Sequence, residues 1–433
     1  MRLGKPLFFL AISICILSCS KDSSSNDPEN QQPTAPAIIV NLFPETTYQT
    51  VAGFGGANRM WGTKSLTPTE AQKAFGTGDN ELGLSLFRVR LSSNKDDWPV
   101  IVEAVKEANK RNVKVLASPW SPPPALKSNN SDVRGYLLPE NYKAYKDYIN
   151  EFLTFMETNG AKIDVVSIQN EPDWKPNYES CDWTAEDMIN FLKAPGDIVG
   201  AKLAAPESLN FNQDMTNAIL SDTEASSKLD IVAGHIYGGG IDKFPMAEAQ
   251  QKEIWMTEWL TNLNTGNAGA ASWSTYPEST KWKETLTMLT TIHDAMTSNW
   301  NAYIWWYLQR YYSFIGDGEQ GTTDGVILKR GYAFSHFSKF VRPGFVRIEA
   351  QESKSSYLKI TAYKNASQNV IVVINPQGFY VKNVQFNSLG SNTAVAYSTS
   401  ETTIMVETEL NMTGESTMLD FSPYSVTTII LNK

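Results

Sequence analysis

The sequence predicts an α/β protein in which a (β/α)8 TIM barrel carries an antiparallel β-sandwich as a side domain. From Val51 to Tyr332, short β-rich runs alternate with longer amphipathic stretches, the pattern of parallel strands joined by crossover helices. Eight such runs occur, which is the number that closes a barrel of this kind. Beyond Arg342 and Pro343 the pattern changes to short alternating strands separated by turn-rich segments, which is typical of a β-sandwich.

Each predicted barrel strand is a short apolar run, and the segments between the runs have helical spacing, as in WPVIVEAVKEANKRN. The eight runs are VAGFGGAN at 51, LSLFRVRL at 84, VKVLASPW at 113, DVVSIQN at 164, AKLAAPE at 201, DIVAGHIY at 230, EIWMTEW at 253 and NAYIWWYL at 301. The segment AIIVNLF at 37 precedes the barrel but has strand character, so we expect it to join the sandwich. The predicted domains are a barrel at 51–333 and a sandwich made of 37–50 plus 334–433.

The first 36 residues predict export rather than folded structure. Arg2 and Lys5 precede an apolar run that is too short for a stable membrane span, and residues 16–19 (ILSC) resemble a bacterial lipobox. Cys19 would then be the lipidated first residue, and residues 20–36 a flexible tether, similar to those of surface-exposed Gram-negative lipoproteins. We expect a lipid anchor in the outer membrane; the alternative is a plain signal peptide and a periplasmic or secreted protein.

Composition excludes several classes of function. The chain has 433 residues and a net charge of -9, which argues against a nucleic-acid-binding protein. Of the three cysteines, two lie in the export segment, so Cys181 alone remains and no internal disulfide is expected. Three histidines in all predict no metal cluster.

Two glutamates stand where a TIM barrel holds its reactive groups, at the carboxyl ends of strands. Glu171 follows the fourth run, in SIQNEPDW, and Glu258 ends the seventh, in IWMTEWL. Glycoside hydrolysis needs two carboxylates across the scissile bond, one to protonate the leaving oxygen and one to attack or to activate water. Each glutamate alone could be an ordinary loop acid, but the pair predicts a glycosidase.

Four tryptophans at or just after predicted strand ends predict a cleft for a polysaccharide, because sugar rings stack on flat aromatic side chains. In the adjacent pair of Trp305 and Trp306, strand alternation allows only one to contact ligand, and we favour Trp306. The four are Trp120, Trp174, Trp259 and Trp306.

These residues lie in stretches that resemble glycoside hydrolase family 30, most closely its glucuronoxylanase subfamily. The resemblance spans about residues 37 to 433, and its most specific stretch is KRGYAFSHFSKFVRPGFVRIEA. It implies a barrel with an attached sandwich, retention of anomeric configuration, no metal or cofactor, Glu171 as acid/base and Glu258 as nucleophile. The other matching stretches are GFGGANRMW at 53, SPWSPPPALK at 118, SIQNEPDW at 167, GHIYGG at 234, MTEW at 256 and IWWYLQRYYSFI at 304.

Four residues near the expected carboxylates have predicted supporting roles. Asn170 is expected to hydrogen-bond the sugar 2-hydroxyl, and Tyr237, at the end of the sixth run, to hold the nucleophile. Arg88 is expected to orient a site carboxylate, with a structural ion pair as the alternative. For His235, a buried structural hydrogen bond is at least as good an interpretation as a direct role in the reaction. Like-charge repulsion from Glu258 is expected to raise the pKa of Glu171.

The loop after the eighth run departs from the subfamily. Where glucuronoxylanases commonly have Arg-Ser-Tyr-Gly, this chain reads RYYS from Arg310, which keeps the arginine and, as Tyr312, the second aromatic residue. Leu260 and Leu263 stand where the family often has a Tyr and a Ser that contact the glucuronate. We expect Arg310 and Tyr312 to bind that group, with an ion-paired loop arginine as the alternative.

The predicted function is therefore a monomeric endo-β-1,4-xylanase that acts on plant cell-wall glucuronoxylan and is guided by the 4-O-methylglucuronate branch. Two alternatives remain. One is a family 30 enzyme for another β-glycan, such as linear xylan, β-1,6-glucan or a β-glucoside. The other is a non-catalytic glycan-binding lipoprotein, which would not need both glutamates.

Overall fold

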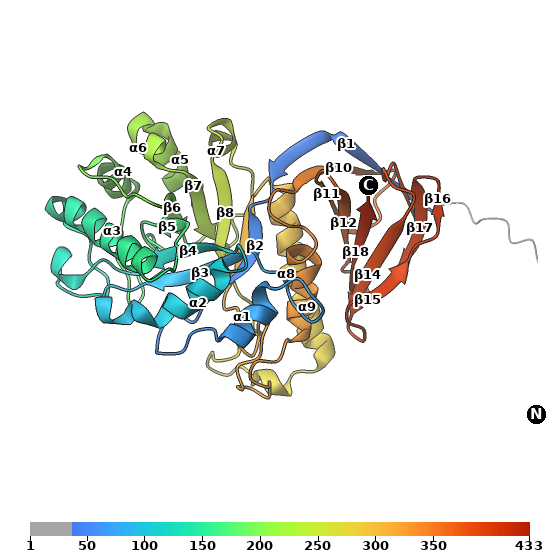
Figure 1. The fold of residues 1–433 in the computed structure, drawn as a ribbon, viewed down its shortest axis with the longest axis horizontal. Coiled ribbons are helices and arrows are strands. Elements are labelled where there is room, and N and C mark those ends of the chain that lie inside the picture. The colour runs from blue at the N-terminus through green and yellow to red at the C-terminus, as the bar shows by residue number, and fades with distance from the viewer. Residues whose placement is uncertain (1–36) are drawn as a thin grey trace, which may run out of the picture. The chain divides into compact units, whose positions relative to one another are not determined.

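The computed structural model of the protein describes residues 37–433. The expected signal segment with Cys19 and the tether at residues 20–36 lie outside the described residues. Within them, the chain forms a closed eight-stranded barrel followed by a ten-stranded sheet (Figure 1). No helix in this part of the chain has both the length and the apolar character that crossing a bilayer requires.

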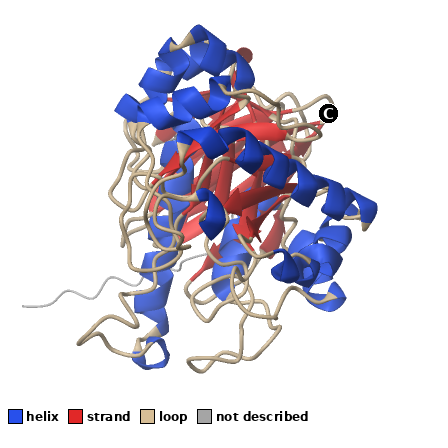
Figure 2. Cartoon of the chain, turned by 90° about the vertical axis from the view of Figure 1, so that its left-hand side faces the viewer, coloured by secondary structure: helices blue, strands red, loops and turns tan. Residues whose placement is uncertain are grey.

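The barrel is built from parallel strands, one within each of the eight predicted runs, so the predicted fold class is confirmed. The strands alternate with helices that lie outside them (Figure 2). The barrel strands are β2 (Gly53–Ala57), β3 (Leu86–Leu91), β4 (Lys114–Pro119), β5 (Val165–Ser167), β6 (Lys202–Ser208), β7 (Ile231–His235), β8 (Glu253–Glu258) and β9 (Ala302–Trp305).

The helices form where the sequence combines apolar periodicity with end signals. In the helix at 142–158, Tyr145, Ile149, Phe152 and Met156 recur at helical spacing and are all buried. Capping boxes begin two other helices, at Thr67 and at Thr184. The helices are α1 (Pro68–Phe75), α2 (Pro99–Asn109), α3 (Tyr142–Thr158), α4 (Ala185–Lys193), α5 (Gln213–Ser221), α6 (Thr223–Lys228), α7 (Pro245–Ala249), α8 (Glu278–Thr297) and α9 (Lys329–Ser338).

The barrel interior is filled at one end by small and branched apolar side chains and Trp255, and at the other end by polar side chains. Alternation along the strands places Leu86 in a buried interior cluster, with Arg88 two residues further along β3. On β9, Ala302 and Ile304 belong to the same cluster, whereas Trp305 points outward and packs among the helices. The barrel interior thus consists of a packed apolar core and, next to it, a layer of charged side chains.

The side domain is one continuous sheet in the order β15-β14-β18-β12-β11-β10-β1-β13-β17-β16. Strand β1 lies inside the sheet, antiparallel to β10 and parallel to β13, and every other pair is antiparallel. Strands from both halves of the sheet share one apolar core. The strands are β1 (Ile38–Thr50), β10 (Val346–Glu352), β11 (Lys359–Lys364), β12 (Gln368–Asn375), β13 (Val381–Asn387), β14 (Ala394–Ser400), β15 (Val406–Glu409), β16 (Met412–Thr413), β17 (Ser416–Phe421) and β18 (Ser425–Asn432).

Side domain and barrel share a buried boundary. Val370 and Val372 of β12 belong to the barrel core, whereas the alternate residue Ile371 belongs to the side-domain core. His336 of α9 is fully buried, and its two ring nitrogens lie 2.8 Å from the hydroxyls of Thr428 and Thr399. Because α9 ends only at Ser338, the last barrel helix continues past the expected domain limit at residue 333.

Candidate active site

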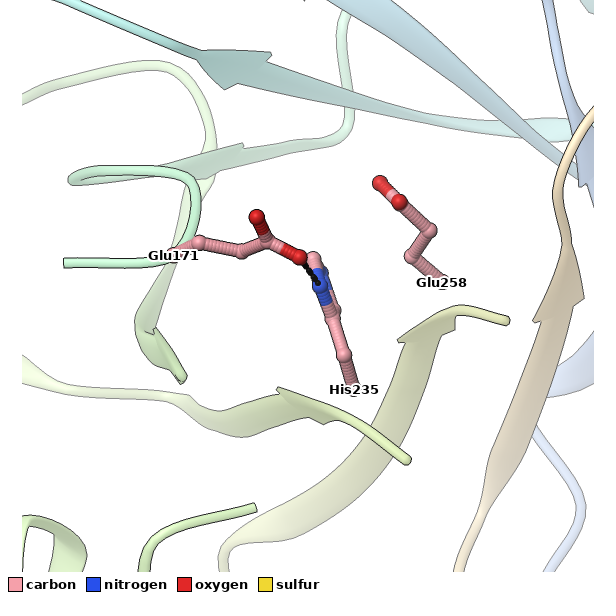
Figure 3. Close-up of side chains that lie close together, drawn as sticks. All are labelled: Glu171, His235 and Glu258. Carbon is pink, nitrogen blue, oxygen red and sulfur yellow. Dashed lines mark hydrogen bonds and ion pairs between the residues drawn. The ribbon is translucent and has the colours of Figure 1, made fainter. Parts of the chain in front are cut away.

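Glu171 and Glu258 face each other at the carboxyl ends of β5 and β8 (Figure 3). One carboxylate oxygen of Glu171 lies within 4.8 Å of one of Glu258. Both side chains are almost completely enclosed, since the residues are 6% and 7% exposed. Glu171 has a backbone φ of +46°, an uncommon value for a residue with a side chain, and its N–H donates to the carbonyl of Glu207 at 3.0 Å.

Each oxygen of Glu258 accepts one hydrogen bond. The guanidinium of Arg88 donates from Nη1 to Oε2 at 2.5 Å, and the hydroxyl of Tyr237 donates to Oε1 at 2.8 Å. Arg88 also donates from Nη2 to Oδ1 of Asn170 at 2.6 Å. Since the amide oxygen of Asn170 is thereby engaged, its NH2 group is the part that remains to donate to a ligand. The contacts from Arg88 and Tyr237 fix the position of the Glu258 carboxylate, and Arg88 places a full positive charge beside it.

The pKa of Glu171 is raised above its usual range, first by burial and then by the charge of Glu258. Burial thus contributes more than the repulsion expected from the sequence. His235 opposes the rise, because its Nδ1 lies 2.9 Å from Oε1 of Glu171 and interacts better with the ionised form. Burial alone would lower the pKa of His235, but Glu258, Glu171 and Glu207 raise it to about 9. The imidazole is therefore protonated at neutral pH.

Glu207, the last but one residue of β6, is a third site carboxylate that sequence reasoning missed. It is fully buried, 2.9 Å from Nη2 of Arg88, and it accepts a hydrogen bond from the hydroxyl of Ser118 at 3.0 Å. Burial opposes its ionisation, but Arg88 and His235 hold its pKa at about 2. A signal existed in the sequence, because Glu207 also ends one of the eight predicted strand runs.

The charges of the site balance when Glu171 is protonated. Glu207 and Glu258 supply two negative charges, and Arg88 and His235 supply two positive ones. Ligand atoms of Glu171, His235 and Glu258 do come within 4.8 Å of one another, a spacing that could hold a metal ion. These atoms are, however, already engaged with protein groups: Nδ1 of His235 with Glu171, and the two oxygens of Glu258 with Arg88 and Tyr237. The site therefore places a buried carboxyl group, Glu171, beside a carboxylate that Arg88 and Tyr237 hold in place.

An aromatic cleft of about 690 Å³ opens above the two glutamates. Of the predicted aromatic residues, Trp120, Trp174, Tyr237 and Trp306 line it. Trp259 does not line it, because its ring packs edge-on against Trp305 at 5.5 Å. Three further aromatic residues of the cleft were not singled out from the sequence: Trp61, Tyr178 and Tyr307. Trp61 and Tyr178 lie in loops whose course the sequence does not reveal, and Tyr307 lies within the eighth predicted run but beyond the end of β9.

Arg310 and Tyr312, the two residues expected to bind a glucuronate, differ in their exposure to solvent. Arg310 is 40% exposed on its side chain and donates from Nη1 to Oδ2 of Asp317 at 3.1 Å. Tyr312 is only 5% exposed and lines a separate cavity beside Trp273, not the cleft. The reason is that the loop after β9 folds back, so the ring of Tyr312 packs edge-on against Tyr311 at 5.0 Å.

Comparison with known proteins agrees with this geometry. The family model described as "Glycosyl hydrolase family 30 TIM-barrel domain" matches residues 72–308. The glucuronoxylanase XynC of Bacillus subtilis (strain 168) is 34% identical over 408 residues, which cover 92% of each chain.

Two solved structures resemble the whole described fold. The family 30 subfamily 8 xylanase Xyn30A from Clostridium acetobutylicum is 30% identical, with a TM-score of 0.79 over 92% of this chain and 99% of that one. A family 30 endoxylanase from Clostridium papyrosolvens is 28% identical, with a TM-score of 0.78 over 92% and 100%. The match to the family model and the identity along nearly the entire chain show that the protein belongs to glycoside hydrolase family 30.

Proposed function

We propose that the protein is a retaining endo-β-1,4-xylanase that cleaves glucuronoxylan and is guided by the 4-O-methylglucuronate branch. The observation that carries the mechanism is the separation of the Glu171 and Glu258 oxygens, within 4.8 Å. Retaining glycosidases hold their two carboxyl groups roughly 5 Å apart, whereas inverting enzymes leave roughly 6.5 to 9.5 Å for a water molecule.

In the first step, Glu258 attacks the anomeric carbon while the bond to the leaving chain breaks and Glu171 donates its proton to the leaving oxygen. Burial raises the pKa of Glu171, which favours the protonated form that this step needs. Forming the ester removes the charge of Glu258, which lowers the pKa of Glu171. Glu171 then takes a proton from water, whose oxygen attacks the anomeric carbon and releases Glu258.

The xylan specificity is supported by the relatives described above, since the two solved structures are described as xylanases and the curated relative as a glucuronoxylanase. An open cleft lined by aromatic side chains suits a polymer that is cut internally. Arg310 supports branch guidance, because an acidic protein needs a locally fixed cation to bind a carboxylate.

A product profile on glucuronoxylan, linear xylan and β-1,6-glucan tests the proposed function. We expect glucuronoxylan to be the preferred substrate. Its chain should be cleaved at a fixed distance from each branch. Equal cleavage of linear xylan would refute guidance by the branch, and preference for β-1,6-glucan would refute the xylanase assignment while leaving the retaining chemistry intact.

We also propose that the enzyme is exported and anchored through a lipid on Cys19, with plant cell-wall xylan as its polymer and without metal or cofactor. The support for export and the lipid anchor is the sequence of the first 36 residues. Membrane fractionation of a Cys19 variant tests the anchor.

A further inference from the structure

Two arginines from different loops share one buried carboxylate beside the cleft. Oδ2 of Asp317 lies 3.1 Å from Nη1 of Arg310 and 3.8 Å from Nη2 of Arg59. Arg310 belongs to the loop after β9, and Arg59 to the loop after β2, the neighbouring strand of the closed barrel. The side chain of Asp317 is fully buried, and its single charge is shared by the guanidiniums of both arginines.

The positive charge of this pair exceeds what Asp317 can neutralise. Two guanidiniums meet one carboxylate, which leaves a net charge of one, and both side chains remain accessible, at 23% for Arg59 and 40% for Arg310. The Nε of Arg59 is buried and has no hydrogen-bond partner among the described residues. Within residues 37–433, Arg310 uses only Nη1, so its Nε–Nη2 edge is free to bind a carboxylate through two parallel hydrogen bonds.

Neither arginine lines the aromatic cleft itself, but the two loops that carry them both contribute residues to it. Trp61, two residues after Arg59, and Tyr307, three residues before Arg310, both line the cleft. Met60, between Arg59 and Trp61, packs in one cluster with Trp120 and Trp306. An anionic branch on a polymer bound in the cleft could therefore reach both guanidiniums.

We propose that Arg59 is a second specificity-determining cation, which binds the branch carboxylate together with Arg310. This inference rests on the proposed function and deepens it, because it assigns to Arg59 the contact that the sequence suggested for Tyr312. Asp317 orients both guanidiniums from below without exposing its own charge. The alternative is that Arg59 only completes an ion-pair cluster that holds the two loops together.

The experiment compares kcat/KM on glucuronoxylan with kcat/KM on the same polymer after chemical reduction of its uronate carboxyl groups. The reduced polymer keeps each branch but removes its charge. The variants, in the full chain, are Arg59→Gln, Arg59→Lys and Arg310→Gln. The matched control is Lys64→Gln, which removes an exposed cation from the same loop as Arg59 and from outside the proposed site.

We expect Arg59→Gln to lower kcat/KM on glucuronoxylan about tenfold, the size of a lost charge-assisted hydrogen bond, while the reduced polymer is cleaved as before. Arg310→Gln should have a similar or larger selective effect. Arg59→Lys should restore part of the loss, since it returns the charge without the planar fork. Lys64→Gln should change neither rate.

Two results would overturn the inference about Arg59 while the proposed function stands, provided that Arg310→Gln lowers kcat/KM on glucuronoxylan alone. In the first, Arg59→Gln lowers kcat/KM equally on both polymers. In the second, Arg59→Gln changes kcat/KM on neither polymer. A wild-type enzyme that cleaves both polymers equally well would instead refute guidance by the branch itself. Thermal unfolding of Arg59→Gln and Arg59→Lys separates a folding defect, which lowers both rates, from the selective loss that the inference requires.

Discussion

Glu258 and Glu171 lie in different environments because their neighbours differ. Glu258 accepts hydrogen bonds from Arg88 and Tyr237, which stabilise its negative charge. Glu171 is enclosed, and its hydrogen-bonding partner is the ring of His235. In the proposed mechanism two similar carboxylates therefore take opposite roles, one as nucleophile and the other as acid, and environment rather than residue type decides between them.

Replacing each glutamate with glutamine should have distinct consequences. Glu258→Gln should abolish formation of the glycosyl-enzyme, with a fall in kcat of many orders of magnitude. Glu171→Gln should keep turnover of aryl xylosides with good leaving groups, because an activated leaving group needs no proton in the first step. Burst kinetics and mass spectrometry of trapped intermediates measure both. Equal loss on activated and natural substrates in Glu171→Gln would contradict its role as acid.

The charge of His235 determines the direction in which the pH profile of kcat/KM should shift when this residue is replaced. Activity requires protonated Glu171, so kcat/KM falls as pH rises through the pKa of that carboxyl. The protonated ring of His235 lowers this pKa, so His235→Asn, which removes the charge, should raise it. The alkaline limb of the pH profile should move to higher pH, even if the maximal rate falls. A limb that stays in place or moves to lower pH would show that the ring serves only packing.

At the scale of elements, the strands of the barrel were more predictable than the loops. All eight predicted runs contain a strand, because buried parallel strands show as short apolar runs between amphipathic helices. Glu171 and Glu258 could be found from the same pattern, since strand ends define the site. Trp61 and Tyr178 could not, and neither could the contact of Arg310 with Asp317, because these depend on how loops fold back on one another.

Strand β1 is the element whose deletion should lower the stability of the protein most. It is hydrogen-bonded on both sides, to β10 and to β13, and it buries Ile38, Val40 and Leu42 in the side-domain core. Burying such side chains contributes about 1.5 to 3 kcal/mol each, so their loss is comparable with the net stability of a domain. A chain that begins at residue 51 should therefore be insoluble or unfold far below the intact enzyme.

The control for this truncation begins at residue 37 and keeps β1. It should unfold at the same temperature as the full chain and retain activity, as measured by differential scanning fluorimetry and xylan hydrolysis. A soluble, active chain that begins at residue 51 would contradict the inserted position of β1 in the sheet.

At the scale of the whole molecule, barrel and side domain are expected to fold as one unit. Alternate residues of β12 lie in the barrel core and in the side-domain core, and His336 of α9 bonds to two threonine hydroxyls of the sheet. The apolar run NVIVVIN reflects burial on both faces, which sequence periodicity alone could not distinguish from a strand inside a sandwich. The side domain thus supports α8 and α9, which follow β8 and β9.

The first 36 residues predict where the enzyme works. If Cys19 carries the acyl chains, Cys19→Ala should move the enzyme from the membrane fraction to the soluble fraction without changing its activity on xylan, because the variant loses the acyl chains that anchor it. Detergent partitioning and immunoblotting of cell fractions measure this. Unchanged membrane fractionation would contradict lipidation.

The most direct test of the central claim is the anomeric configuration of the first product. The separation of the Glu171 and Glu258 oxygens, within 4.8 Å, leaves room for direct attack but not for an intervening water molecule. Proton NMR during the first minutes of xylan hydrolysis, before mutarotation, should therefore show the β-anomer at the newly formed reducing end. An α-anomer formed first would contradict Glu258 as nucleophile and the retaining mechanism built on it.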